Sequence, residues 1–365
     1  MKANGHGGDI YAAARELRRG VDRLIDFSAS INPLGPSSKV WRALSKARVV
    51  LQHYPDPACL DLRHVLALRW RCSIEEIVVG NGSTELIHVL PSALDLRHLL
   101  IVGPTFSEYT SAMALVGGRV TTVCAERGQG YCPPLERVAS LLSQKHAKRR
   151  DIDAVLLCNP NSPTGQACDA KAVMELARLA QRRHVWLIVD ETFADYCQER
   201  SILLQRSSFS RVVILRSLTK FYGLPGLRVG YAVSTPTVIE KLSAHIPPWS
   251  VNAMGQVAAM TALNDAAYVV KSVSFMRNER ARFTTRLAQL PGCAVFPSQA
   301  NFLFVELPCQ WPAAAMTARL RQDGLLIRDC SSIPGLNSHS IRVAVRTRRE
   351  NHRLVTALSQ LLGHR

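Results

Sequence analysis

The stretch ILRSLTKFYGLPGLRVGYAV, residues 214–233, combines a strand-like apolar run with a loop that is rich in glycine and proline. One lysine, Lys220, lies in it shortly after Ser217 and Thr219 and eight residues before Arg228. Two hydroxyls, a lysine and an arginine on one turn can form a cradle for a phosphate group. The lysine either holds an anion or acts as a covalent catalyst, and the rest of the chain decides between these functions.

Short apolar runs followed by polar residues recur along the chain from Ile77 onwards. Strands as uniformly apolar as these are typical of parallel sheets with helices on both faces. The sequence therefore predicts an α/β fold with a mostly parallel, doubly wound sheet. In such sheets ligands bind at the carboxyl ends of the strands. The predicted strand ends carry polar or glycine-rich sequence, namely GNGSTE, GPTF, NPNSPTG, DET and SLTK.

The pattern changes after about residue 250, which suggests a second domain. A long helical stretch over residues 252–290 leads to strand-like runs such as FLFVEL and SIRVAVR. We therefore predict a smaller α+β domain over residues 251–365 and a large α/β domain over residues 41–250. Residues 1–40 are predicted to form an arm that packs with the small domain.

The composition excludes several classes of protein. A formal charge of +17 raises the question of nucleic acid or an anionic membrane as a partner. No zinc-finger spacing or RNA-binding aromatic motif is found, so we expect no nucleic acid and favour an anionic small molecule. No apolar run approaches the ~18 residues of a membrane span. The N-terminus lacks the apolar segment of a secretory signal. Ten cysteines without any C-x-x-C pair indicate neither a metal site nor a disulfide framework, which favours the cytoplasm.

Two further motifs add chemistry to the lysine. GNGSTE is predicted to open a helix whose free N–H groups can hold a phosphate, although an ordinary helix cap fits it equally well. Asp190 ends the apolar run VWLIVD, where a buried carboxylate is costly unless it is paired. It is either a cap or ion-pair residue, or the partner of a protonated ring nitrogen. Lysine, carboxylate and phosphate cradle together are what a pyridoxal phosphate enzyme requires.

In this order and at these separations, SLTKFYGLPGLRVG, NPNSPTG, VDET and GNGSTE resemble the motifs of the aspartate-aminotransferase fold family, the fold type I pyridoxal phosphate enzymes. The resemblance implies that Lys220 holds the cofactor covalently and that Asp190 pairs with its ring nitrogen. It implies a homodimer with shared active sites, because Tyr54 would reach the phosphate of the partner's cofactor. The remaining implied cofactor-binding residues are Ser83, Thr84, Ser217, Thr219 and Arg228 at the phosphate, Phe106 on the ring, and Asn161 or Ser162 at the phenolic oxygen. The family usually has asparagine where Ser162 stands.

Two branches of this family share these motifs. They are the histidinol-phosphate aminotransferases and the threonine-phosphate decarboxylases of cobalamin biosynthesis, and the sequence resembles both. HGGDIYAAA, DFSASINPLGPS and IPPWSVNA resemble the decarboxylases, as does Pro225, where the aminotransferases tend to have alanine. This resemblance implies decarboxylation of O-phospho-L-threonine to 1-aminopropan-2-ol O-phosphate. The alternatives are a histidinol-phosphate-type aminotransferase and a non-catalytic regulator or nucleic-acid binder of the same fold.

The resemblance to the decarboxylases also implies a set of residues that bind a phosphorylated amino acid. Arg342 would bind the α-carboxylate, because its planar fork matches a carboxylate with two hydrogen bonds. Ser30 stands where the decarboxylases tend to have asparagine. The implied substrate-binding residues are His6, Gly7 and Arg328 at the substrate phosphate, Arg342 at the carboxylate, and Ser30, Asn32 and Ser162 nearby.

Overall fold

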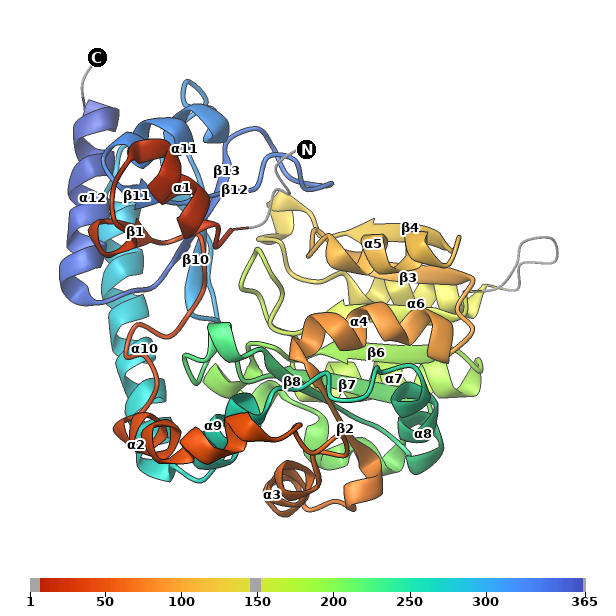
Figure 1. Ribbon diagram of the computed structural model, residues 1–365. Helices are drawn as coiled ribbons and strands as arrows, with labels where there is room; N and C mark the ends of the chain where they lie inside the picture. Colours follow the sequence, from red (N-terminus) through yellow and green to blue (C-terminus); the bar gives the residue numbers. More distant parts are fainter. Residues whose placement is uncertain (1–6, 145–151, 364–365) are drawn as a thin grey trace.

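The computed structural model describes residues 7–144 and 152–363 (Figure 1). These residues build a central seven-stranded sheet in the order β2-β8-β7-β6-β5-β3-β4. β8 runs antiparallel to both of its neighbours, and the other pairs are parallel. The prediction of a mostly parallel α/β sheet is confirmed. The strands are β2 (Ile77–Asn81), β3 (His98–Gly103), β4 (Arg119–Cys124), β5 (Ala154–Cys158), β6 (Trp186–Asp190), β7 (Val212–Ser217) and β8 (Val229–Val233).

Helices cover both faces of this sheet, which explains why its strands are apolar on both sides. α4, α5 and α8 pack on one face, toward which Leu156 and Ile188 point. α6 and α7 pack on the other face, toward which Val155 and Val189 point. No helix in the described part of the chain is both long enough and apolar enough to cross a membrane. The helices are α4 (Gly82–Ala93), α5 (Glu108–Leu115), α6 (Leu135–Ser143), α7 (Ala170–Arg182) and α8 (Pro236–Ala244).

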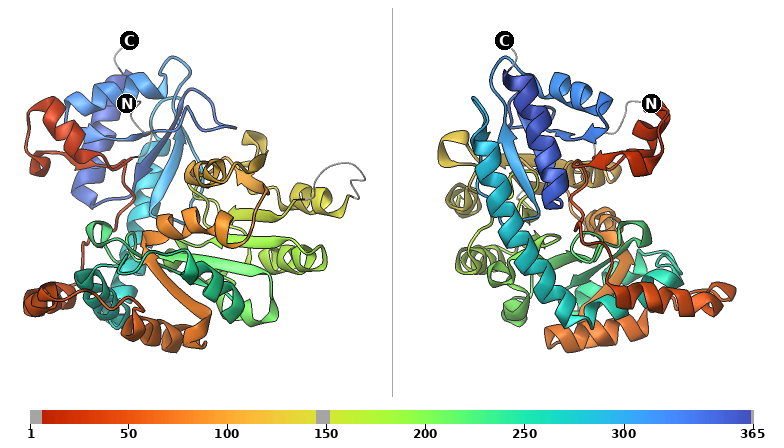
Figure 2. Two further views of the ribbon diagram at one scale, coloured as in Figure 1. Left: turned by 45° about the vertical axis from the view of Figure 1, so that its right-hand side comes forward. Right: turned by 90° about the vertical axis from the view of Figure 1, so that its left-hand side faces the viewer.

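A second, antiparallel sheet in the order β12-β13-β10-β9 lies with α10, α11 and α12 at the other end of the molecule (Figure 1). The long helix α10 runs along one side of the molecule and connects the two parts (Figure 2). The N-terminal segment joins the smaller part, because β1 pairs in parallel with β11 and Ala13 of α1 packs with Leu326. The elements are α1 (Ile10–Leu17), β1 (Ile25–Asp26), β9 (Ala294–Val295), β10 (Phe302–Glu306), α11 (Ala313–Gln322), β11 (Leu325–Leu326), β12 (Arg328–Asp329), β13 (Ser340–Ala344) and α12 (Arg348–Gly363).

The stretch predicted as one long helix is two helices, α9 (Ala253–Leu263) and α10 (Ala266–Ala288). Asp265 breaks it, because its side chain accepts a hydrogen bond from the backbone N–H of Tyr268 and caps α10. The same carboxylate lies 3.1 Å from Nζ of Lys39. α9 packs against α2 (Ser38–Lys46) and α3 (Leu60–Trp70), whereas α10 packs against β10 and α12. The domain limits at residues 40 and 250 stay a prediction.

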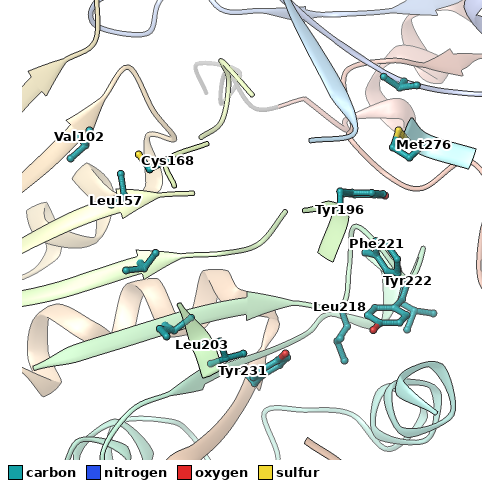
Figure 3. Close-up of a cluster of buried hydrophobic side chains, with 14 of the residues drawn as sticks. Val102, Leu157, Cys168, Tyr196, Leu203, Leu218, Phe221, Tyr222, Tyr231 and Met276 are labelled. Atoms are coloured by element: carbon teal, nitrogen blue, oxygen red, sulfur yellow. The ribbon is translucent and has the colours of Figure 1, made fainter. Parts of the chain in front are cut away.

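The largest cluster of buried apolar side chains fixes the backbone around Lys220 (Figure 3). Phe221, directly after the lysine, packs edge-on against Tyr196 with ring centroids 4.9 Å apart. Tyr222 stacks on Tyr268 of α10. Leu218 belongs to the same cluster. The residues on both sides of Lys220 are therefore anchored in the core, so the lysine is held on a rigid turn.

Candidate active site

A cavity of about 590 Å³ lies at the edge of the large sheet where the carboxyl ends of its parallel strands meet. The small sheet and the N-terminal segment form its other walls, and Cys158, Asp190 and Ser217 are the last residues of β5, β6 and β7. The position agrees with the rule for ligand sites in open α/β sheets. The predicted residues that line the cavity are Gly7, Ser30, Ser83, Thr84, Phe106, Ser162, Asp190, Ser217, Thr219, Lys220, Arg228, Arg328 and Arg342.

One end of the cavity has the features of an anion site. α4 begins at Gly82, which has a φ of +76°, and a Cβ added there would lie 2.7 Å from Nη2 of Arg228. Glycine therefore lets the guanidinium lie against the start of the helix. Oγ of Ser217 and Oγ1 of Thr219 are 2.7 Å apart, and Ser83 lies in the first turn of α4. Hydroxyls, an arginine and the positive end of a helix together favour a bound phosphate.

Asp190 forms the floor of the cavity and is 3% exposed. Its Oδ2 accepts a hydrogen bond of 2.7 Å from the hydroxyl of Tyr109, and its Oδ1 accepts one of 2.9 Å from the backbone N–H of Thr192. Burial, and then the charge of Asp190, raise the pKa of Tyr109 well above its ordinary value, so the phenol stays a donor. Burial also raises the pKa of the Cys158 thiol to about 12. Asp190 is thus held by neutral donors, and its charge is available to a cationic group in the cavity.

Lys220 lies between the anion site and a second group of cations. Its carbonyl accepts a hydrogen bond of 3.0 Å from the backbone N–H of Asn32, which ties the N-terminal segment to the lysine turn. Burial lowers the pKa of Lys220 to about 8, and the positive charges of Arg342 and Arg228 act in the same direction. A lysine with this pKa is partly neutral near neutral pH, and a neutral amine is a nucleophile.

The second group of cations comes from the small sheet. Nη1 of Arg342 donates a 2.8 Å hydrogen bond to Oγ of Ser162, and Nη2 donates one of 2.7 Å to the carbonyl of Ser28. Burial lowers the pKa of Arg342 to about 10, and the charge of Arg328 adds to this effect. Within residues 7–144 and 152–363, neither arginine forms an ion pair with a carboxylate. Two cationic side chains of the small sheet therefore line the cavity in addition to Arg228 at the start of α4.

Three predicted residues do not line the cavity. Asn161 donates from its amide to the carbonyl of Pro104 and to Oγ1 of Thr164. Of the two residues predicted at the phenolic oxygen, Ser162 is the one that lines the cavity. Asn32 donates to the carbonyl of Phe221 at 2.8 Å and also bonds to Tyr268 and Ser272. Tyr54 is 81% exposed, and its ring packs at a tilt against that of Trp249, with centroids 5.0 Å apart. His6 lies outside the described residues.

The structure adds residues that the sequence patterns did not single out. Tyr109 and Thr192 hold Asp190, and Ser28 supplies the carbonyl that accepts from Arg342. Phe193 and Ile333 also line the cavity. Helical spacing gave no signal for Tyr109, because α5 begins at Glu108 and Phe106 lies before it.

The side chains of the cavity fit pyridoxal phosphate. The hydroxyls, Arg228 and the start of α4 match its phosphate, and the carboxylate of Asp190 matches a protonated ring nitrogen. The amine of Lys220, with its pKa near 8, matches the aldehyde. Phe106 supplies an aromatic wall for the ring.

Comparisons with known proteins agree with this geometry. A family model described as aminotransferase class I and II matches residues 22–358. The chain is 36% identical to a threonine-phosphate decarboxylase of Salmonella typhimurium over 98% of this chain and 96% of the relative. It is 32% identical to a histidinol-phosphate aminotransferase of Moorella thermoacetica over 98% of this chain and 90% of the relative. Among solved structures, it is similar to L-threonine-O-3-phosphate decarboxylase from Porphyromonas gingivalis, with a TM-score of 0.80, 25% identity and coverage of 92% and 99% of the two chains.

Proposed function

The chain belongs to the aminotransferase class I and II family, and from that premise we propose that it uses pyridoxal phosphate to decarboxylate O-phospho-L-threonine to 1-aminopropan-2-ol O-phosphate and carbon dioxide. The observation that carries the proposal is that Arg328 and Arg342 of the small sheet line the same cavity as Arg228, which lies at the start of α4. Arg228 belongs to the cofactor-phosphate site, which leaves Arg342 and Arg328 for a substrate with two anionic groups. The similarity to the Salmonella relative supports the same choice.

Each residue then has a role that follows from its chemistry. When bound, pyridoxal phosphate supplies an aldehyde that captures amines and a protonated ring that accepts electrons. Lys220 would hold the cofactor through its amine, and the carboxylate of Asp190 would keep the ring nitrogen protonated. Arg228, with the hydroxyls of Ser217 and Thr219, anchors the cofactor phosphate.

The substrate-binding residues select the bond that breaks. Arg342 binds the carboxylate and Arg328 binds the substrate phosphate, so the substrate is held at two ends. Binding energy from the remote phosphate would thereby fix the orientation of the carboxylate, and this orientation would select the bond between Cα and the carboxylate for cleavage. Once carbon dioxide has left, Nζ of Lys220 would deliver the proton that replaces it at Cα.

The proposal is tested by incubating the purified protein with pyridoxal phosphate and O-phospho-L-threonine, without any keto acid. We expect release of carbon dioxide in equal amount to 1-aminopropan-2-ol O-phosphate. If no carbon dioxide appears, but amino groups exchange once 2-oxoglutarate is added, the chain is an aminotransferase instead. The second outcome is a real alternative because of the relative from Moorella.

The lowered pKa of Lys220 predicts how the protein captures its cofactor. Only the neutral amine reacts with an aldehyde, so capture by cofactor-free protein should accelerate as the pH rises and be half-maximal near pH 8. An ordinary lysine would need a pH near 10.5. The rate is followed by the absorbance change on mixing with pyridoxal phosphate at a series of pH values. Removal of a neighbouring charge in Arg342→Gln should raise the midpoint, and a wild-type midpoint above about pH 10 would contradict the assignment.

We propose further that two copies of the chain form a homodimer and that each copy contributes Tyr54 to the site of the other. The observation that supports this is the exposure of Tyr54, together with that of Trp41, Leu51 and Trp249, on the outside of this chain. Exposed aromatic and aliphatic side chains that lie together mark a surface for a partner. A tyrosine hydroxyl at that surface can donate to a phosphate.

Hybrid dimers provide the test of the shared sites. Tyr54→Ala alone should weaken cofactor retention, and Lys220→Ala alone should be inactive. A hybrid of the two variants contains one complete site only if Tyr54 acts across the interface, so its activity at low cofactor concentration should exceed that of either parent. No gain in the isolated hybrid would show that Tyr54 does not act on the partner's site.

A further inference from the structure

We infer that Phe302 is a positioning residue that holds the carboxylate-binding arginine, Arg342, in its working orientation; the inference rests on the function proposed above. The Cζ atom of Arg342 lies 5.0 Å from the centre of the Phe302 ring, and the ring is fully buried. Phe304, not Phe302, is the residue of β10 directly opposite Arg342 in β13. The arginine side chain therefore crosses diagonally to reach the ring of the neighbouring position.

The aromatic contact solves a specific problem for a substrate-binding arginine. A carboxylate partner would fix the guanidinium, but it would also occupy the N–H groups and neutralise the charge that the substrate needs. The face of an aromatic ring attracts the cation without accepting its in-plane hydrogen bonds. Arg342 uses Nη1 and Nη2 for Ser162 and the carbonyl of Ser28, both of which are neutral. The positive charge of Arg342 thus remains available to an anion in the cavity.

Phe302 is itself held from the cofactor side of the cavity. Phe193, which follows Asp190 by three residues and lines the cavity, meets the Phe302 ring edge-on at 5.0 Å and 81°. The preceding residue, Asn301, donates a 2.9 Å hydrogen bond to the carbonyl of Ser30. The ring therefore connects the segment after Asp190 with the arginine of the small sheet. Its position sets the guanidinium plane relative to the cofactor site.

The experiment replaces Phe302 by phenylalanine that carries one, two or three ring fluorines. Fluorines weaken the negative face of the ring in steps and change its shape little. We expect KM for O-phospho-L-threonine to rise in steps, by about 5- to 30-fold in total. The inhibition constant of 1-aminopropan-2-ol O-phosphate should stay constant, because this amine has no carboxylate for Arg342 to bind. A general structural defect would instead weaken the binding of both ligands and raise both constants.

Phe304 provides the matched control, since it lies on the same face of β10 but packs against Tyr131 and Phe296. The same fluorines at Phe304 should leave both constants unchanged. Phe302→Leu is a second variant. It should likewise raise KM for O-phospho-L-threonine and leave the inhibition constant of the amine unchanged. An unchanged KM across the fluorinated Phe302 series, or an equal loss of both ligands, would overturn the inference.

A parallel measurement on Arg342→Gln tests the role of Arg342 independently of the role of Phe302. If this variant loses the amino acid and keeps the amine product, Arg342 binds the carboxylate, and the fluorine series then tests Phe302 alone. If Arg342→Gln weakens the binding of both ligands equally, or of neither, Arg342 does not bind the carboxylate. The proposed function is then contradicted at this residue, whatever the result for Phe302.

Discussion

Lys220→Ala is expected to lower turnover of O-phospho-L-threonine by at least about 10³-fold. Two contributions are lost together, because the same Nζ exchanges the cofactor with the substrate amine and returns a proton to Cα. The lowered pKa of Lys220, about 8, suits both tasks, since neutral and protonated forms are then both accessible near neutral pH. Cofactor should still bind, although more weakly, because Arg228, Ser217 and Asp190 remain.

The measurement combines a carbon dioxide assay with the absorbance of the bound cofactor. Lys241→Ala is the matched control, because Lys241 is an exposed lysine of α8 outside the cavity, and its removal should leave the rate unchanged. Turnover of Lys220→Ala within tenfold of the unmodified protein would refute the covalent role of the lysine.

The fold was predictable because its signals are local. The run that became β5 is apolar throughout, and that of β6 is apolar up to its last residue, Asp190. In the structure, neighbours such as Val155 and Leu156 face opposite sides of the sheet, and both sides are covered. Residues that follow parallel strands must meet at one edge. Asp190 and Ser217 therefore converge on one cavity although they lie far apart in the sequence.

The directions of single side chains were not predictable in the same way. Asn161 and Ser162 are adjacent in one loop, and only the path of the backbone decides that Ser162 faces the cavity. Asn32 belongs to a motif of the resemblance, yet its amide joins the segments of Phe221 and Tyr268, which are 189 and 236 residues away. Hydrogen bonds between such distant residues leave no periodic pattern in a sequence.

The break between α9 and α10 was likewise not predictable from the sequence pattern. Asn264 and Asp265 favour caps and turns, but they are only two residues within a long helical pattern. The cap on α10 and the ion pair with Lys39 make the break favourable. Lys39 lies more than 200 residues earlier, so this stabilisation depends on the tertiary fold.

Asp190→Asn is expected to lower turnover by about 10²- to 10⁴-fold and to change the KM for O-phospho-L-threonine little. Asparagine keeps the shape of the side chain, and its single carbonyl oxygen can still accept the hydrogen bond from the backbone N–H of Thr192. Its NH2 group then faces the hydroxyl of Tyr109, to which it donates instead of accepting. The main loss is the negative charge, and that charge would keep the ring nitrogen of the cofactor protonated and able to accept electrons.

Two further variants make the Asp190 test specific to charge. Tyr109→Phe retains the carboxylate and removes one hydrogen bond to it, so a smaller loss of about 10-fold is expected. Asp61→Asn, at an exposed position of α3, controls for the loss of a negative charge elsewhere. All three variants are compared by kcat, by KM and by the pH dependence of the cofactor absorbance. The absorbance should respond most strongly to Asp190→Asn, because only that change removes the charge beside the ring nitrogen. If Asp190→Asn retains kcat within about threefold, Asp190 is a structural residue, and the electron-accepting role of the ring must be supported from elsewhere in the cavity.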